Sequence, residues 1–153
     1  MKHVKKSVLL FYSPHEMYTI VTTVEDYPKF LPWCSRVDIL QRDAGGLTAR
    51  LQLSYSGLRQ AFTTRNINTP DQAVHINLVD GPFSMLDGTW RFLALPAPAG
   101  GTAHPNACKI EFEMRYAFAN GPLEALISPV FDRIANIFVD AFVRRAEQVH
   151  GPR

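Results

Sequence analysis

The sequence is poor in cysteine, has no long apolar run and carries no large excess of one charge. Its two cysteines, Cys34 and Cys108, form no Cys-x-x-Cys pair, which excludes a zinc knuckle and a dithiol redox motif and favours free, buried thiols in a reducing compartment. No stretch approaches the ~18 uninterrupted apolar residues that a transmembrane helix needs. The 16 Lys and Arg nearly balance the 14 Asp and Glu, so we expect no direct binding to DNA.

The motifs of common catalytic and metal centres are also missing. The sequence holds no Gly-x-Ser-x-Gly elbow, no His-Glu-x-x-His pair and no phosphate-binding loop. Glu111 and Glu113 alternate with apolar residues, which is typical of a solvated strand face. We therefore expect no catalytic residue, no metal and no resident cofactor. The histidines are too scattered for a metal site: His3, His15, His75, His104 and His150.

A short helix is predicted after a first strand that runs from Val4 to Phe11. Ser13 is suited to cap this helix, Pro14 to its first turn, and Glu16 to close a capping box back onto Ser13. Two prolines in residues 27–34 end the helical spacing. We expect an aromatic and proline-rich connection there.

From residue 35 onward, apolar and polar residues alternate, which is typical of antiparallel strands buried on one face. The alternation is cleanest in residues 47–55, 74–78 and 108–118. Turns containing glycine or proline separate these runs. Together with the first strand they predict a meander of about seven strands.

Helical spacing returns in the last segment, roughly from Pro122 to Val149, with a broad apolar stripe. Such a helix is roughly 40 Å long and must cross the whole sheet. We expect Pro129 to kink or divide it near residues 127–128, which makes the helix a candidate lid whose segment before Pro129 can shift relative to residues 131–149. One helix is too narrow to cover seven strands laid flat, so the sequence predicts an α+β fold with a curved sheet wrapped around the helix.

Four segments carry a resemblance to a known family: YPKFLPWC at 27–34, DGPFSMLDGTWRF at 80–92, and the helical residues 131–136 and 141–146. They resemble the ubiquinone-binding START-domain proteins, a polyketide cyclase/dehydrase-like family, and its bacterial branch of ribosome-association toxins, RatA. The resemblance implies one helix-grip (START/Bet v 1-like) domain over residues 1–153, with an apolar cavity between sheet and long helix. The chain departs from the family mainly in residues 95–105, a hairpin connection that looks longer than usual.

The candidate ligand-binding residues lie in the aromatic connection, on the inward face of the strands and on the helix stripe. Among polar side chains, Asn66 shares a strand face with Phe62, and Tyr116 shares one with Phe112, so these two are candidates for hydrogen bonds to a quinone carbonyl. A role as ordinary core remains the alternative for the connection and for the stripe. The other candidates are Tyr27, Phe30, Leu31, Trp33, Phe83, Trp90, Met114, Phe131, Ile134 and Phe138.

Three functions stay open. The resemblance implies first a non-catalytic binding protein for ubiquinone or a related polyisoprenoid lipid that supports respiratory electron transfer. It implies, as an alternative, a toxin that binds the large (50S) ribosomal subunit and blocks subunit joining, with Lys2, Lys5, Lys6, Arg144 and Arg145 as available cations. A cyclase-like enzyme is the third. We expect a cytoplasmic protein whose partner is a hydrophobic small molecule or lipid, with transient contact to the surface of the inner membrane.

Overall fold

The computed structural model describes residues 1–95 and 107–153. The connection predicted over residues 95–105 lies outside these ranges, apart from Leu95. Seven antiparallel strands form one sheet in the order β1-β7-β6-β5-β4-β3-β2, so β1 and β2 are its edges. In chain order the elements are β1 (Lys2–Leu10), α1 (Pro14–Thr22), the 3-10 helix η1 (Val24–Lys29), β2 (Cys34–Asp43), β3 (Gly46–Tyr55), β4 (Leu58–Thr69), β5 (Ala73–Asp80), β6 (Phe83–Ala94), β7 (Cys108–Phe118) and α2 (Gly121–His150).

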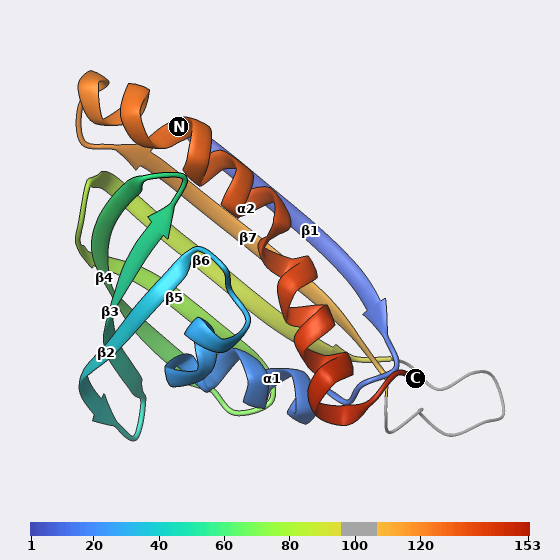
Figure 1. Ribbon diagram of the computed structural model, residues 1–153. Helices are drawn as coiled ribbons and strands as arrows, with labels where there is room; N and C mark the ends of the chain where they lie inside the picture. The colour runs from blue at the N-terminus through green and yellow to red at the C-terminus, as the bar shows by residue number, and fades with distance from the viewer. Residues whose placement is uncertain (96–106) are drawn as a thin grey trace, which may run out of the picture.

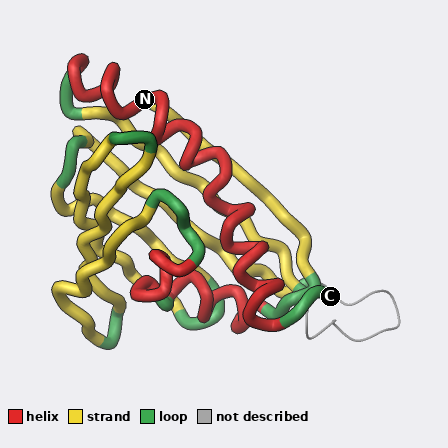
Figure 2. The backbone as a smooth tube through the Cα atoms, viewed as in Figure 1, coloured by secondary structure: helices red, strands yellow, loops and turns green. Residues whose placement is uncertain are grey.

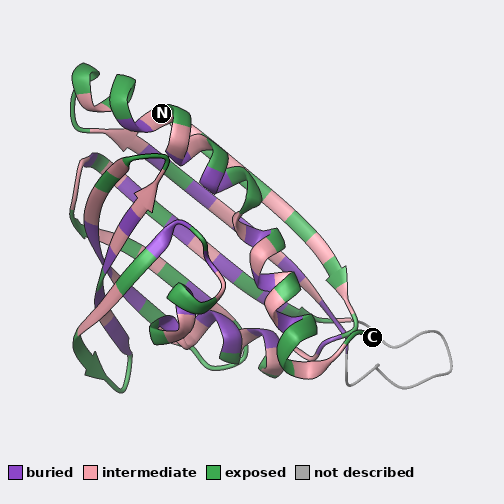
Figure 3. Ribbon diagram, in the orientation of Figure 1, coloured by how far each residue is buried: buried purple, intermediate pink, exposed green. Residues whose placement is uncertain are grey.

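The sheet curves around α2, which runs along its concave side (Figure 1). The shorter helices α1 and η1 lie on the same side, near the C-terminal half of α2 (Figure 2). Buried and exposed residues alternate along the strands (Figure 3), because successive side chains point to opposite faces of a sheet. The buried face lies under the helices, and the predicted α+β helix-grip fold is confirmed.

The helix α2 is continuous from Gly121 to His150, so the prediction that Pro129 divides it is wrong. Pro129 removes the hydrogen bond to the Ala125 carbonyl, but both residues are exposed, so this carbonyl is open to solvent. The Asn120 side chain caps the helix by accepting a hydrogen bond from the Leu123 N–H at 2.9 Å. Neither α2 nor another helix in the described ranges is long and apolar enough to cross a membrane.

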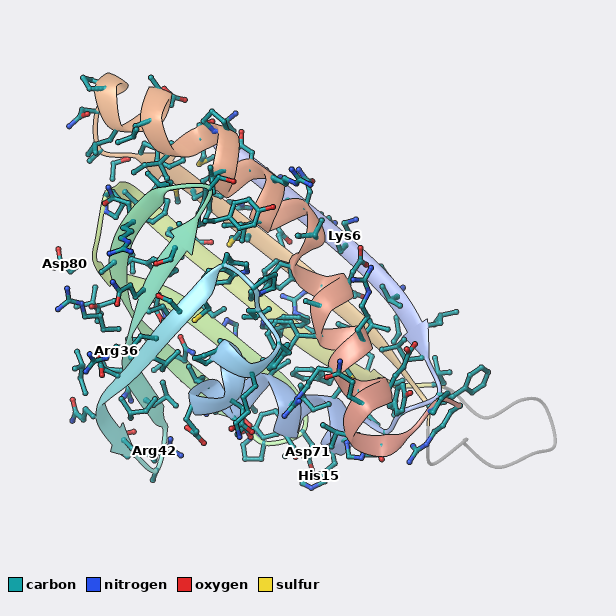
Figure 4. All side chains as sticks on the ribbon, in the orientation of Figure 1. Lys6, His15, Arg36, Arg42, Asp71 and Asp80 are labelled. Atoms are coloured by element: carbon teal, nitrogen blue, oxygen red, sulfur yellow. The ribbon has the colours of Figure 1, made fainter. Side chains whose placement is uncertain are left out.

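The capping box predicted for α1 is present. The Ser13 hydroxyl accepts from the Glu16 N–H at 3.0 Å, and the Glu16 carboxylate accepts from the Ser13 N–H at 2.9 Å. On the exposed side of α1, His15 lies 2.6 Å from Asp71 in the β4–β5 turn (Figure 4). The expected irregular connection begins as the 3-10 helix η1, which buries Val24.

Two glycines permit close approaches next to the inner face. A side chain at Gly46, where φ is +152°, would place its Cβ 1.9 Å from the Asn66 carbonyl oxygen. At Gly81, also at φ +152°, a Cβ would lie 2.7 Å from the Phe62 Cβ. The strand register is unbroken at Gly88, which pairs with Ile76 on β5 and Met114 on β7.

The two cysteines are free and buried, as expected. Burial raises the pKa of the Cys34 and Cys108 thiols to about 11, so both stay protonated at neutral pH.

A polar cluster fastens the C-terminal end of the chain to α1. The Arg153 guanidinium donates two hydrogen bonds to the Glu16 carboxylate, at 2.7 and 2.9 Å, and His150 lies 3.4 Å from the same group. The Tyr12 hydroxyl donates to the Gly151 carbonyl at 2.7 Å. The hydrogen bonds from Arg153 lower the pKa of Glu16 to about 2.

This cluster predicts acid sensitivity. Because the pKa of Glu16 is about 2 in the folded protein and 4.5 ordinarily, its contribution to stability is complete above pH 4.5 and lost as pH falls towards 2. We expect Glu16→Gln to flatten the pH dependence of the free energy of unfolding in that window. Urea denaturation at a series of pH values measures this, with Glu124→Gln at an exposed α2 position as control. Parallel curves for wild type and Glu16→Gln would refute the account.

Candidate functional site: an apolar cavity under α2

A cavity of about 60 Å³ lies between α2 and the concave face of the sheet. The alternation of β4 turns Phe62, Thr64 and Asn66 to the same side. On α2, spacings of three and four residues bring Phe131, Ile134, Ala135 and Phe138 onto one stripe. The complete lining is Val24, Tyr27, Trp33, Leu51, Phe62, Thr64, Asn66, Ile76, Leu86, Phe112, Met114, Phe131, Ile134, Ala135 and Phe138.

The lining is apolar except at one polar pair on β4. The Thr64 hydroxyl donates to the Asn66 side-chain oxygen at 3.1 Å, and both residues are buried. The Tyr27 hydroxyl donates to the Val21 carbonyl in α1, and burial raises the pKa of this phenol. An Asn side chain offers two N–H donors besides its oxygen, so this pair provides the cavity with hydrogen-bonding capacity in an apolar setting.

Aromatic side chains pack against the residues that line the cavity, on the side away from it. Trp90 is fully buried, with ring centroids 4.7 Å from Phe112, 5.0 Å from Phe142 and 5.8 Å from Phe138. Such edge and tilted contacts add to the stabilisation from burial itself. They fix the position of the two cavity-lining rings, Phe112 and Phe138.

The structure brings nine of the fourteen candidate residues together around the cavity. The strands supply four and α2 supplies three, and the remaining two flank the aromatic connection. Their contact with a ligand stays a prediction. These nine are Tyr27, Trp33, Phe62, Asn66, Phe112, Met114, Phe131, Ile134 and Phe138.

The other five candidates do not line the cavity. Phe30 and Leu31 border a groove on the outer side of the connection. Phe83 packs against Phe131 and Phe118, with centroids 4.9 and 5.4 Å apart, at the end of the sheet next to the β5–β6 turn. Trp90 lies one layer behind the lining. Trp90 was correctly placed on the inner face, and Phe83, seven residues away, is also buried because the register shifts between Phe83 and Met85. The phase of a strand does not reveal how far along the sheet the cavity extends. The fifth is Tyr116.

Tyr116 points inward as predicted, but its hydroxyl is already bonded to α2. It donates to one Asp132 carboxylate oxygen at 2.5 Å, while Lys2 and Ser128 donate to the other at 2.9 and 3.0 Å. Burial opposes ionisation of Asp132, yet these three hydrogen bonds hold its pKa below the usual value. Tyr116 is therefore part of a clamp between β1, β7 and α2, which corrects its predicted role as a ligand handle.

Six lining residues were missed by the sequence reasoning. Thr64 lies between Phe62 and Asn66 on the same phase of β4, and Ala135 is four residues beyond Phe131, so both had a usable signal. Thr64 and Ala135 were not predicted because both side chains are small, and large side chains were expected to form the lining. The six are Val24, Leu51, Thr64, Ile76, Leu86 and Ala135.

A sequence profile of the family described as polyketide cyclase / dehydrase and lipid transport matches residues 10–143. The chain belongs to this family. The resemblance to the polyketide cyclase/dehydrase-like family and its RatA relatives is confirmed, and a START superfamily protein of Mycobacterium smegmatis shares the fold.

Proteins similar to this chain carry different names. A ribosome association toxin RatA of Pseudomonas aeruginosa is 37% identical over 149 residues, which cover 97% of this chain and 98% of the relative. A mitochondrial coenzyme Q-binding protein of Drosophila melanogaster is 28% identical over 96% of this chain and 59% of that protein. The crystal structure of the Zhui aromatase/cyclase of a Streptomyces species matches with a TM-score of 0.80 at 16% identity, over 96% of this chain and 94% of that one, which shows the fold alone.

The polyketide cyclase / dehydrase and lipid transport fold thus occurs in proteins named for ribosome association, for coenzyme Q binding and for cyclisation. A shared fold does not choose among these activities, because function depends on the side chains of the site. The chemistry of the cavity lining must decide for this chain.

Proposed function

We propose that the protein binds an apolar molecule with a polar ring head, ubiquinone or a related polyisoprenoid lipid, without transforming it. The observation that carries this proposal is the buried Thr64–Asn66 pair inside an otherwise apolar cavity. A quinone head has two carbonyl acceptors on an apolar ring, which suits an amide donor surrounded by aromatic and aliphatic side chains. The coenzyme Q-binding relative supports the same ligand class.

The cavity volume sets a condition on binding. Pockets for small molecules typically measure about 300–1,000 Å³, whereas this cavity measures about 60 Å³. Binding of a quinone head therefore requires an outward movement of a covering element. The candidates are α2 and the connection from Tyr27 to Trp33, which cover the sheet on this side.

The absence of acid–base groups from the lining favours binding over catalysis. None of the fifteen lining residues is an Asp, Glu, His, Lys, Arg or Cys. Tyr27 is the one titratable residue among them, and burial raises the pKa of its phenol. A proton donor or acceptor for cyclisation should have a pKa near the working pH, so the lining supports the non-catalytic proposal.

Asn66→Leu tests this role directly. We expect the variant to bind a short-chain ubiquinone analogue about 3- to 10-fold more weakly, because one hydrogen bond of about 0.5–1.5 kcal/mol is lost. The quenching of tryptophan fluorescence during a titration measures the affinity, since Trp33 lines the cavity. Asn77→Leu, on the exposed side of β5, is the matched control. Equal affinities for wild type and Asn66→Leu, or no saturable quenching of the wild type, would contradict the proposal.

Association with the ribosome, at its large subunit, is the second candidate, and the 37% identical relative named a ribosome association toxin supports the coarser part of it. The cations that the sequence predicted for this role have different surroundings in the structure. Lys2 forms an ion pair with Asp132. Lys5 and Lys6 on β1, of which Lys6 is labelled in Figure 4, border a hollow with Arg91 and Lys109, where the four cations outnumber the two carboxylates, Glu111 and Glu113. Such a basic surface fits a phosphate backbone. Both candidates place the protein in the cytoplasm, and the first adds contact with the inner membrane.

A further inference from the structure

A groove of about 520 Å³ runs along the outer side of the connection that closes the cavity. The same two elements border both spaces. On the connection, Tyr27 and Trp33 face the cavity, while residues 28–32 face the groove. On α2, Phe138 faces the cavity and Ile137 the groove. The full lining is Pro28, Lys29, Phe30, Leu31, Pro32, Ile137, Asp140, Ala141, Arg144, Arg145 and Gln148.

The floor of the groove is apolar and partly open to solvent. Ile137 is 42% exposed, and Pro32 is also exposed. The Phe30 ring is half-buried and packs edge-on against Phe142, at 5.1 Å between centroids. Phe142 in turn contacts Tyr27 at 5.3 Å, so one layer of aromatic rings separates the groove from the cavity.

Cations surround this apolar floor. Lys29, Arg144 and Arg145 line the groove against one carboxylate, Asp140. Just outside it, Asp26 lies 3.0 Å from Lys29 and 4.0 Å from Arg145. The Arg145 guanidinium also lies 5.3 Å from the centre of the Phe30 ring.

Arg144 is the cation of the groove that is most available to a partner. It is exposed and forms no ion pair with any residue in the described ranges. Long basic side chains keep their charge in water while their stems cover apolar surface. Surfaces that combine cations with exposed apolar side chains bind at the boundary between lipid headgroups and acyl chains.

We propose that this groove docks the protein onto a membrane surface that carries anionic phospholipids. The apolar floor contacts the acyl boundary, and the cations contact the phosphate groups. The docked face is then the connection from Tyr27 to Trp33, whose displacement opens the cavity towards the bilayer. The inference rests on the proposed function, because an apolar ligand that resides in a bilayer needs a path from the bilayer into the protein.

The test measures binding to phosphatidylcholine vesicles with and without phosphatidylglycerol by co-sedimentation. We expect the wild type to bind the anionic vesicles and to lose binding as salt is raised. Lys29→Glu/Arg144→Glu should weaken binding by about 25-fold or more, since each cation near such a surface contributes roughly five-fold. The matched control is Arg50→Glu/Arg59→Glu, at exposed positions of β3 and β4. Thermal unfolding verifies that both variants are folded.

A second assay separates this inference from the proposed function. Uptake of ubiquinone is measured from vesicles and from detergent micelles. Slow uptake from vesicles with normal uptake from micelles, in the groove variant alone, supports docking. Normal uptake from micelles by a wild type that does not bind vesicles would overturn docking and leave the cavity proposal standing. Vesicle binding equal in the groove and control variants would overturn docking, as would a groove variant that loses only ribosome co-sedimentation. Uptake from neither source would contradict the cavity proposal itself.

Discussion

Ala135→Leu is expected to weaken ligand binding about five-fold or more and to leave the protein folded. Ala135 is buried on α2 and faces the cavity, so three added carbon atoms occupy the space that the ligand head needs. Binding to the filled site costs about 1–3 kcal/mol through overpacking, which corresponds to a loss of affinity of about 5- to 150-fold. Titration with a short-chain quinone measures the loss.

The control for this variant is Ala125→Leu, which adds the same atoms at an exposed position of the same helix. It should bind like the wild type. Urea denaturation checks that both variants unfold cooperatively. If Ala135→Leu folds and still binds the quinone with wild-type affinity, the ligand does not occupy this cavity.

Trp90→Ala is expected to produce the largest loss of stability. Trp90 is fully buried behind Phe112 and Phe138, and truncation of a buried tryptophan lowers the free energy of unfolding by about 3–5 kcal/mol. Trp90→Phe should cost much less. Its smaller ring leaves some space, but it removes the indole Nε1–H, which has no acceptor within the described residues and whose burial without a partner costs about 1–3 kcal/mol.

Guanidinium denaturation of the two variants distinguishes these effects. The expected order of stability is wild type, then Trp90→Phe close behind, then Trp90→Ala far below. A Trp90→Phe variant as unstable as Trp90→Ala would mean that the indole nitrogen has a partner that the structure does not show.

The regular elements were predictable from sequence because their patterns are local. Alternation identified the strands, and the capping box of Ser13 and Glu16 identified the start of α1. The same alternation placed Phe62, Asn66 and Phe112 on the inner face, where they line the cavity. Local periodicity is enough for such assignments, since each depends only on neighbours in the chain.

The predictions that were wrong concern features that depend on contacts between segments distant in the sequence or on solvent exposure. Nothing near Tyr116 in sequence indicates that Asp132 of α2 meets its hydroxyl, sixteen residues away, with Lys2 of β1 as the third member. The effect of Pro129 depended on its exposure, which helical spacing alone does not give. Residues 121–129 supply no side chain to the cavity, so the predicted shift of the segment before Pro129 would not by itself open the cavity.

The polar contacts that attach α2 to the rest of the fold indicate which element moves when a ligand enters the cavity. The Asp132 clamp holds the helix to β1 and β7, and the cluster of Glu16, His150 and Arg153 holds its C-terminal end to α1. The cavity lies between these attachments. Because movement of α2 would break them, the connection from Tyr27 to Trp33 is the better candidate for the moving element.

Mass spectrometry of lipid extracted from the purified protein tests the central claim most directly. We expect a quinone or another polyisoprenoid lipid to be recovered with the wild type, and at least about five-fold less with Ala135→Leu, in keeping with its weaker affinity. A wild-type protein that is free of lipid, and that sediments with large ribosomal subunits in a sucrose gradient, would contradict the claim and favour ribosome association.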